Sequence, residues 1–504
     1  MTMQGPLTIP ELLADGVDQW PDDVWCHTPE ESITRAEIYA QACRCAGGLA
    51  SAGIGAGDHV VIVLPNGIDF VRTWFAVAMR GAIAIGVNPT AAPSELAAVV
   101  AELSAKLIVG APEQSGTANV AHTDVAALMQ HDELAAVPIS PDQPATYIQT
   151  SGSTGTPKFV IETHAMYTMA AEGYPYWLDL TADDVVLTTL PLSHLNAQAY
   201  SVLGSYCCGA QLILLPKFSA SRFWQQVNDY GATVFNAIGA MVEILMSREP
   251  HPDERGHALR YCYSAPAPTE KRHKEIEERF GCRLVIGYAL SETPYGMIAP
   301  VDKPPVYGSM GRPRQHPRMR PINHARIIDS AGADVPVGQT GELILKNPAL
   351  TPGYYGRDEE SDALRTGDWL RTGDLAYADA EGNYYFAGRR KELIRRRGEN
   401  LSPADVETVL DAHPAVSSSA VIGVPSPLTE EDIKAFVMLK QGRHVTPLDL
   451  AAWCRDRLPP YKRPRFVELV DEWPLTETQK IAKRELPRNR NSTELDIESV
   501  SPTV

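Results

Sequence analysis

The chain has 504 residues, of which 44% are hydrophobic and 21% charged, and its formal net charge is −17 at pH 7. This is globular composition, with length for about three folding units, which excludes disorder over most of the chain. The negative charge opposes a large nucleic-acid footprint or binding to an anionic membrane, because both need clustered cations. One small phosphate ligand on a local loop remains compatible with it.

The apolar runs and the cysteines indicate the compartment. No apolar run reaches the roughly 18 to 20 residues that span a bilayer, and the N-terminus lacks a signal-peptide pattern. The eight cysteines show no C-x-x-C spacing, which disfavours a zinc site or a disulfide framework. We therefore expect a reduced, cytoplasmic protein with no nucleic-acid or membrane partner. The sequence indicates no oligomeric state.

Short β-rich runs alternate with helical patterns over the first 290 residues. A helix is predicted over residues 68–79, where Phe70, Trp74 and Phe75 recur at helical spacing. Such alternation is typical of stacked α/β layers with mostly parallel sheets. Buried strands are predicted over residues 59–64, 106–109, 145–148, 185–187, 211–215, 233–235, 260–263 and 283–286.

The pattern changes between residues 308 and 388. Runs such as 342–345 and 383–386 are short and lie among Gly, Asp and Pro, which predicts a small antiparallel β unit. A strongly basic stretch, 389–397, separates this unit from a smaller α+β unit.

The smaller unit opens with a clear helix start. Ser402 is placed as the N-cap and Pro403 at the first helical position, with Asp405 at the third position completing a weak capping box. The predicted fold class is α/β, with a large N-terminal domain and a small, mobile α+β C-terminal domain. The predicted bounds are 1–388 for the first domain, 389–391 for a hinge, 392–490 for the second domain and 491–504 for a disordered tail.

A dense run of hydroxyl residues and glycines directly follows the predicted strand 145–148. Backbone N–H groups and hydroxyls on such a loop approach phosphate oxygens closely, and Lys158 adds a positive charge. The run is not a P-loop, because Lys158 lies three residues beyond the second glycine and no Ser or Thr follows it. A flexible surface loop is the alternative interpretation. The predicted phosphate-binding residues are Thr150, Ser151, Gly152, Ser153, Thr154, Gly155 and Lys158.

With this loop and the motifs that follow it, the chain resembles the adenylate-forming enzymes of the ANL superfamily, which include acyl-CoA synthetases, luciferase and peptide-synthetase adenylation domains. The resemblance extends from about residue 10 to 485. Residues 190–245 and 395–403 are similar to the crotonobetaine/carnitine-CoA ligase branch. The resemblance implies ATP and Mg²⁺ as cofactors and a small carboxylic acid as substrate.

The resemblance also implies an acyl pocket. His194, in the run 190–196, would gate or line it. A histidine beside apolar residues is alternatively a satisfied core residue. Small and apolar residues in the predicted wall favour an uncharged, moderately hydrophobic acyl group. The residues assigned to this pocket are His194, Tyr200, Ala237, Gly239 and Gly287.

The segment 287–293 matches the family's metal and nucleotide motif. By resemblance Glu292 binds Mg²⁺, a hard cation that prefers oxygen ligands, Tyr288 stacks on adenine and Ser291 contacts the α-phosphate. The family usually has Thr in place of Ser291. A more weakly matching segment that packs against adenine consists of Ser264, Ala265 and Pro266.

The C-terminal motifs supply the remaining assignments. The sequence Arg-Thr-Gly-Asp occurs twice, ending at Asp368 and at Asp374. Asp374 is assigned to the ribose hydroxyls because the residues that follow it match the family pattern. Arg389 would reach the ribose or the phosphates, and Lys391 would be the hinge. By resemblance Lys480 neutralises the charge that develops during adenylation.

Two departures concern the second half-reaction. Phe159 and Gln479 stand where the family has glycine, and both changes can restrict loop motion. The predicted function is transfer of the acyl group from acyl-AMP to CoA. The alternatives are an amide synthetase with an amine acceptor, delivery to a separate carrier protein, and a non-catalytic AMP-binding protein, which retention of Glu292 and Lys480 disfavours.

Overall fold

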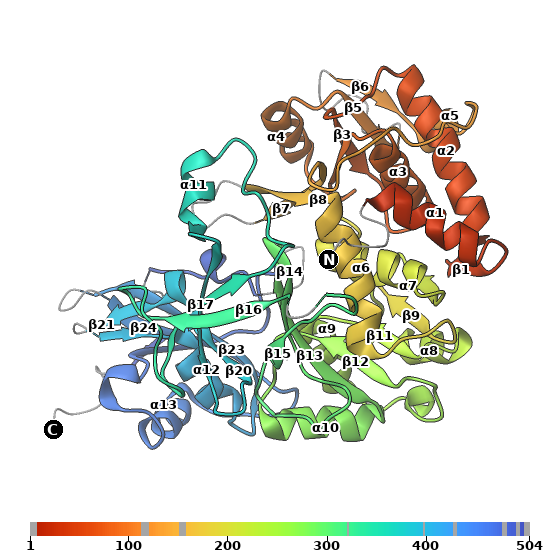
Figure 1. Ribbon diagram of the computed structural model, residues 1–504. Coiled ribbons are helices and arrows are strands. Elements are labelled where there is room, and N and C mark those ends of the chain that lie inside the picture. Colours follow the sequence, from red (N-terminus) through yellow and green to blue (C-terminus); the bar gives the residue numbers. More distant parts are fainter. Residues whose placement is uncertain are drawn as a thin grey trace. The chain divides into compact units, whose positions relative to one another are not determined.

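The structure is a computed structural model that describes residues 8–111, 120–150, 158–319, 322–396, 399–426, 431–475, 481–489 and 494–497 (Figure 1). The chain forms two compact units. The first, called here the N-terminal unit, comprises Met1–Gly239, Pro250–Ala325 and Leu345–Arg371. The second, the C-terminal unit, comprises Ala240–Glu249, Arg326–Ile344 and Thr372–Val504. The predicted domain bounds at 388–391 stay a prediction.

The N-terminal unit contains two large sheets. The first has the order β15-β14-β13-β12-β11-β9-β10-β1-β2, and its neighbours from β13 to β1 are parallel. The second has the order β6-β5-β3-β4-β7-β8 and is parallel except for the β7–β8 pair. The predicted α/β class with mostly parallel sheets is confirmed. The strands of the first sheet are β1 (Val24–His27), β2 (Ser32–Thr34), β9 (Val185–Thr188), β10 (Gln211–Leu214), β11 (Val234–Asn236), β12 (Tyr261–Ser264), β13 (Arg283–Leu290), β14 (Thr293–Ile298) and β15 (Arg312–Pro313); those of the second are β3 (His59–Val63), β4 (Ile83–Gly86), β5 (Leu107–Gly110), β6 (Ala121–Thr123), β7 (Pro144–Thr150) and β8 (Lys158–Thr163).

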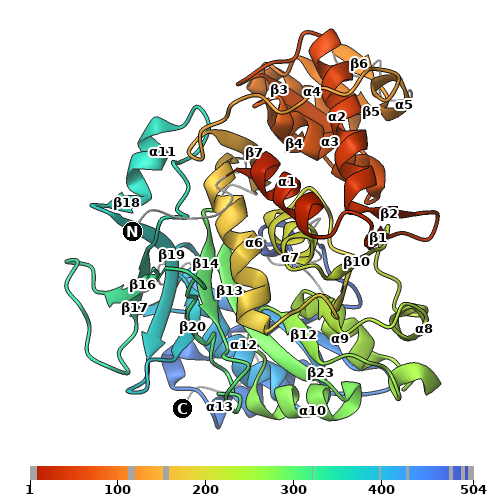
Figure 2. The same cartoon turned by 45° about the vertical axis from the view of Figure 1, so that its right-hand side comes forward.

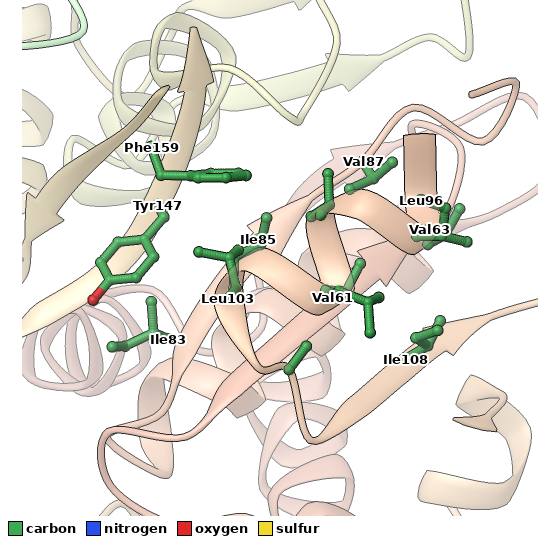
Figure 3. Packing of buried hydrophobic residues seen from close by; sticks show 13 residues of the cluster. Val61, Val63, Ile83, Ile85, Val87, Leu96, Leu103, Ile108, Tyr147 and Phe159 are labelled. Atoms are coloured by element: carbon green, nitrogen blue, oxygen red, sulfur yellow. The ribbon is translucent and has the colours of Figure 1, made fainter. Parts of the chain in front are cut away.

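One face of the second sheet holds a buried cluster of branched and aromatic side chains (Figure 3). Alternate residues of β4, Ile83 and Ile85, point into it, as the period of two in a strand requires. Phe159, which replaces the family's glycine, is 1% exposed and packs in this cluster with Tyr147. Strand β8, which follows the predicted phosphate loop, is therefore anchored by an aromatic side chain.

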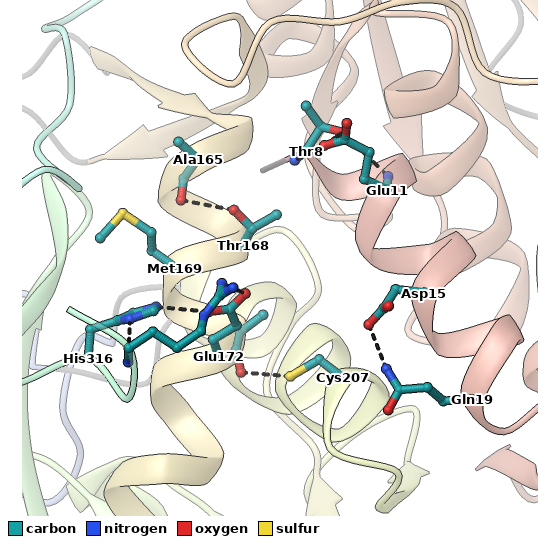
Figure 4. Close-up of polar contacts among 12 residues, drawn as sticks. Thr8, Glu11, Asp15, Gln19, Ala165, Thr168, Met169, Glu172, Cys207 and His316 are labelled. Atoms are coloured by element: carbon teal, nitrogen blue, oxygen red, sulfur yellow. Dashed lines mark hydrogen bonds and ion pairs between the residues drawn. The ribbon is translucent and has the colours of Figure 1, made fainter. Parts of the chain in front are cut away.

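Some helices of the N-terminal unit, such as α1 and α2, begin at side-chain caps. In α1 the Thr8 side chain and Glu11 form a reciprocal capping box (Figure 4). The predicted helix 68–79 is confirmed as α3, and α6 lies beside β14 in both ribbon views (Figures 1 and 2). The helices are α1 (Ile9–Gln19), α2 (Arg35–Ser51), α3 (Ile68–Met79), α4 (Pro93–Leu103), α5 (Val125–Leu128), α6 (His164–Leu178), the π-helix η2 (Asn196–Leu203), α7 (Gly204–Cys207), α8 (Phe223–Asp229), the 3-10 turn η3 (Pro252–Glu254), α10 (Glu270–Phe280) and α11 (Asp358–Ala363). The helix α9 (Gly239–Ser247) belongs to the C-terminal unit except for its first residue.

An ion pair fastens the segment after β15 to α6. His316 Nε2 lies 2.9 Å from a carboxylate oxygen of Glu172, and Arg318 Nε donates to the same oxygen at 3.1 Å. Figure 4 shows Glu172 and His316 facing each other. His316 is 1% exposed, so the pair is shielded from solvent on one side. This contact fixes the course of the chain around residue 314.

A third sheet has the order β16-β17-β19-β18, with β20 on β19. Its β18–β19 and β19–β20 pairs are antiparallel, as predicted for this stretch. The predicted runs 342–345 and 383–386 fall within or at the start of its strands. The strands are β16 (His324–Ile328), β17 (Gly341–Lys346), β18 (Arg365–Thr366), β19 (Trp369–Ala378) and β20 (Tyr384–Arg389).

The C-terminal unit also holds the two-stranded sheet β21-β22 and the four-stranded sheet β23-β24-β25-β26. The apolar faces of α12 and α13 pack on the latter through residues such as Val406 and Leu450. The elements are η4 (Arg390–Glu392), β21 (Ile394–Arg396), β22 (Glu399–Leu401), α12 (Pro403–Asp411), β23 (Val416–Pro425), β24 (Glu431–Leu439), α13 (Pro447–Arg455), η5 (Pro460–Lys462), β25 (Phe466–Leu469), η6 (Lys483–Glu485) and β26 (Glu494–Asp496).

Two local predictions are corrected here. The Ser402 side chain caps α12 by accepting from the backbone N–H of Ala404, and the predicted box with Asp405 is not formed, because Asp405 pairs with Lys462 at 2.5 Å. Part of the predicted disordered tail is ordered, since β26 pairs antiparallel with β25. All eight cysteines are free. None of the helices in the described part of the chain combines the length and apolarity of a membrane span.

Candidate active site

The predicted pocket residues gather at the carboxyl ends of the parallel strands of the first sheet, the edge where α/β sheets bind ligands. The backbone N–H of Ala237, just after β11, donates to the carbonyl of Tyr263 at 2.9 Å. That of Gly239 donates to the carbonyl of Ala265 at 2.8 Å. A Cβ added at Gly287 would collide with the ring and hydroxyl of Tyr263, so glycine is needed for this close approach.

The π-helix η2 supplies Tyr200, and the turn before it carries His194, which is half-buried. π-Helical turns are rare and occur frequently at functional sites. Asn236 on β11 holds η2 in place by donating to Asn196 Oδ1 at 2.6 Å and to Ser201 Oγ at 2.8 Å. Tyr200 Oη donates to the carbonyl of Pro294 at 2.7 Å, which joins η2 to β14.

The predicted adenine-binding residues lie beside the predicted acyl-pocket residues. Ser264 ends β12, and Pro266 Cδ would lie 3.1 Å from a Cβ added at Gly239. Tyr288 lies on β13, half-buried, in the same strand as Gly287. The structure therefore places the adenine-binding and acyl-binding predictions next to each other in one unit.

Glu292 lies in the turn between β13 and β14, directly after Ser291, and belongs to a cluster of polar side chains. Tyr354 Oη donates to Glu292 Oε1 at 2.7 Å. Lys158 Nζ lies 4.8 Å from the centre of the Tyr354 ring and forms an ion pair with Glu360 on α11. Glu292 and Lys158 belong to the predicted motifs, whereas Tyr354 and Glu360 lie outside them. Only the turn-rich stretch before α11 signalled a loop there.

The cluster has the electrostatics of a site for a phosphate–metal group. Burial, reinforced by the charge of Glu292, raises the pKa of Tyr354, so its hydroxyl stays a hydrogen-bond donor at neutral pH. The second carboxylate oxygen of Glu292 makes no hydrogen bond or ion pair with the described residues. Mg²⁺ is bound through one or two carboxylates together with substrate phosphates, and the described residues hold no group of three or more His, Cys, Asp or Glu that would form a complete cage. The donor set at Glu292 fits that mode.

Thr150 and Lys158 flank the predicted phosphate loop on paired strands, and Thr150 Oγ1 donates to the carbonyl of Lys158 at 3.4 Å. The remaining residues of the loop prediction lie outside the described residues, as does Lys480: these are Ser151, Gly152, Ser153, Thr154 and Gly155.

A buried carboxyl group that the sequence analysis did not single out lies close by. Glu162 on β8 is fully buried, and neither carboxyl oxygen has a hydrogen-bond partner among the described residues. Burial, with the charge of Glu292 adding to it, raises the pKa of Glu162 well above its usual range. The side chain is therefore held protonated where an exposed glutamate is ionised.

We expect Glu162→Gln to stabilise the protein at high pH. A raised folded-state pKa contributes stability that is complete below the ordinary value of 4.5 and is lost as pH rises, because ionising the buried group is disfavoured. Each unit of pKa elevation corresponds to about 1.4 kcal/mol. The difference in melting temperature between variant and wild type should be small at pH 5 and grow through pH 8. A difference that is constant with pH would contradict the assignment.

The ribose prediction falls on strand β19. Asp374 is 3% exposed, its backbone N–H donates to Thr372 Oγ1 at 3.1 Å, and its carboxylate lies 3.4 Å from Arg389 Nε on β20. The rejected candidate, Asp368, is 78% exposed in its side chain and pairs with Lys346 at 2.7 Å. The two candidates therefore differ in burial and in their basic partner, and the assignment of Asp374 to the ribose stays a prediction.

The predicted hinge follows directly. Lys391 lies exposed in η4, after Gly388 and Arg389. Gly388 has a φ of 122°, and a Cβ at this position would collide with the Ser402 hydroxyl. Only glycine satisfies both demands.

We expect Gly388→Ala to destabilise the protein by about 2 kcal/mol or more, because backbone strain and the collision with Ser402 add. Urea unfolding measures this loss. Gly382→Ala is the matched control, since Gly382 has a φ of 80° and nothing within 4 Å of its added Cβ. Equal losses in the two variants would mean that the contact with Ser402 contributes nothing.

Comparison with known proteins identifies the family. The family described as AMP-binding enzyme matches residues 13–355, and the AMP-binding enzyme C-terminal domain matches residues 405–480. Because the first match covers more than half of the chain, this chain belongs to the AMP-binding enzyme family. The resemblance inferred from the motifs is confirmed.

Relatives and solved structures agree with this placement. The chain is 32% identical over 495 residues to the crotonobetaine/carnitine–CoA ligase of Salmonella arizonae, covering 92% of this chain and 94% of that protein. It is 30% identical over 508 residues to the sulfoacetate–CoA ligase of Cupriavidus necator, covering 95% and 97%. Its fold matches the benzoate CoA ligase of Burkholderia xenovorans with a TM-score of 0.87 at 23% identity, over 96% of this chain and all of the other. The protein thus has the fold of the acid–CoA ligases, with a large N-terminal and a small C-terminal domain.

Proposed function

We propose that this AMP-binding enzyme activates a small organic acid as acyl-AMP, with release of pyrophosphate, and transfers the acyl group to CoA. The observation that carries the proposal is the cluster at the phosphate loop: the Glu292 carboxylate, held by Tyr354, keeps one oxygen for a cation beside Lys158. Its curated relatives are named as CoA ligases, which favours CoA over an amine or a carrier protein as acceptor.

In the first half-reaction a carboxylate oxygen of the acid attacks the α-phosphorus of ATP. A new P–O bond forms as the bond to the bridging oxygen of the β-phosphate breaks, and pyrophosphate leaves with the electron pair. Positioning and charge stabilisation dominate such transfers, and no enzyme nucleophile is required. Glu292 would hold Mg²⁺, which supplies positive charge at the phosphates. Lys158 reaches them when its ion pair with Glu360 opens.

Other residues orient the nucleotide. Tyr288 and the segment 264–266 take the adenine, Ser291 contacts the α-phosphate, and the buried Asp374 accepts from the two ribose hydroxyls. In the second half-reaction the CoA thiol attacks the acyl carbon, the bond from that carbon to the phosphate oxygen breaks, and AMP leaves with a proton lost from the thiol. Lys391 is the proposed pivot between the two half-reactions.

Carboxylate-dependent ATP–pyrophosphate exchange tests the first half-reaction. The purified chain should catalyse exchange with at least one acid of a broad panel, and product mass with CoA should show the acyl thioester. Exchange without a thioester, but with an amide when amines are supplied, would overturn the acceptor assignment. Absence of exchange with every acid would overturn adenylation itself.

A further inference from the structure

A buried cation lies at the wall of the proposed acyl pocket. Arg314, just after β15, is fully buried. Its Nε donates to the carbonyl of Met297 at 2.9 Å, and its Nη1 donates to the carbonyl of Pro294 at 2.8 Å and to Tyr200 Oη at 2.5 Å. Its Nη2 donates to the hydroxyl oxygen of Tyr263.

Aromatic rings enclose the guanidinium. The rings of Trp177 and Tyr200 lie 4.5 and 5.1 Å from its central carbon, and the Tyr263 ring lies at 5.8 Å. Cation–π contacts of this kind stabilise a desolvated charge. The ion pair of Glu172 with Arg318 fastens the segment that carries Arg314 to α6, so the guanidinium is held in position.

Within the described part of the chain, the charge of Arg314 has no acidic hydrogen-bond partner. Among the described residues its hydrogen-bond partners are two backbone carbonyls and two tyrosine hydroxyls, and none is a carboxylate. Burial opposes its ionisation, but the tyrosine hydroxyls outweigh burial, so the pKa of Arg314 lies above its ordinary value and the side chain stays charged. A buried charge is normally paired, and here the positive potential is directed onto the hydroxyls of Tyr200 and Tyr263.

The Tyr263 hydroxyl connects Arg314 with the predicted wall of the acyl pocket. Its oxygen accepts from Arg314, and its own O–H proton has no acceptor among the described residues. The Tyr263 hydroxyl occupies the space that a side chain at Gly287 would need, and the Tyr263 carbonyl accepts a hydrogen bond from the backbone N–H of Ala237. Both Gly287 and Ala237 belong to the predicted pocket wall. The Tyr200 hydroxyl, by contrast, has no proton left for a substrate, because it donates its proton to the carbonyl of Pro294.

We propose that Tyr263, held and polarised by Arg314, is a specificity-determining residue that donates a hydrogen bond to an oxygen at the far end of the bound acid. The preferred substrates are then acids with a hydroxyl, carbonyl or second carboxylate oxygen remote from the carboxylate that is activated. This deepens the proposed function and rests on it. It revises the uncharged, moderately hydrophobic acyl group that the residue types alone favoured.

The selectivity follows from what an apolar acid leaves unpaired. A bound apolar acid would leave the buried Tyr263 O–H without an acceptor. Sites that hydrogen-bond a polar group of the substrate discriminate strongly against analogues that lack that group.

The test compares matched acid pairs, such as hexanoate with 5-oxohexanoate and adipate, and benzoate with its hydroxybenzoates. In wild type the oxygen-bearing member of the accepted pair should have the higher kcat/KM for pyrophosphate release. Tyr263→Phe should lower that value by about 10- to 100-fold and leave the apolar member nearly unchanged. Tyr261→Phe, on the same strand but beneath Arg260, is the matched control and should alter neither.

Equal losses on both members of a pair would show that Tyr263 is only structural, and no loss on either would show that it does not contact the acid; both overturn the proposal. If Tyr263→Phe does not fold, the substrate preference of the wild type decides the test. A wild type with the higher kcat/KM for the apolar member of each accepted pair would overturn the proposal. Failure of the proposed function is distinguishable, since then no acid of either kind releases pyrophosphate.

Discussion

Replacing Glu292 with glutamine is expected to raise the Mg²⁺ concentration needed for half-maximal pyrophosphate release by at least about 10-fold, and to lower the maximal rate. Glutamine keeps the size of the side chain and still accepts from Tyr354, so the hydrogen bond at 2.7 Å survives. What is lost is the negative charge that a hard divalent cation requires. A magnesium titration of acid-dependent pyrophosphate release measures the effect.

The control for this prediction is Glu270→Gln. Glu270 lies on α10 and pairs with Lys274 at 2.5 Å on the surface, so the substitution removes one negative charge away from the site. Its magnesium titration should match that of the wild type. An unchanged titration in Glu292→Gln would reject the metal-ligand role of Glu292, whatever its effect on the maximal rate.

Residues inside contiguous motifs could be predicted from the sequence. Glu292 and Asp374 each lie in a short, ordered pattern, and the structure places Glu292 in the turn after β13 and Asp374 on β19; their roles stay predictions. The choice between Asp374 and Asp368 depended on the residues that follow each one. The structure gives this choice a physical reason, since one carboxylate is buried beside Arg389 and the other is exposed.

Residues that act across the fold could not be predicted in this way. Tyr354 and Glu360 reach Lys158 from about 200 residues further along the chain, and no local pattern connects them. In the sequence, Arg314 is one of several basic residues in a proline-rich stretch. Its enclosure depends on three aromatic side chains from separate elements. Glu162 interrupts an otherwise apolar strand, a signal that marks burial only once the fold is known.

Element positions were predictable where periodicity was strong. Helix α3 begins and ends at its predicted residues because its apolar face is continuous. Local cap chemistry was less predictable, since Asp405 has two competing partners and pairs with Lys462 instead of completing the box at Ser402. Strand β26 was missed because a polar edge strand has no hydrophobic signature.

The largest effect on rate is expected from Lys480→Ala, which should lower acid-dependent ATP–pyrophosphate exchange by about 10² to 10³-fold. Lys480 lies outside the described residues, so the prediction rests on its place in the C-terminal motif. A positive charge aimed at the reacting oxygens stabilises the transition state of adenylation more than the bound reactants, so the loss should appear in the maximal rate. Exchange kinetics at saturating acid and ATP measure it.

The second half-reaction separates this role from a general loss of structure. When prepared acyl-adenylate and CoA are supplied, Lys480→Ala should still form the thioester, because the charge that Lys480 offsets develops only during adenylation. Lys440→Ala, which removes an exposed lysine of the same unit, should leave both half-reactions unchanged. Loss of thioester formation in Lys480→Ala, with adenylation intact, would place this lysine in the transfer step and reverse the assignment. A side chain that stabilises the transition state of adenylation cannot be dispensable for adenylation.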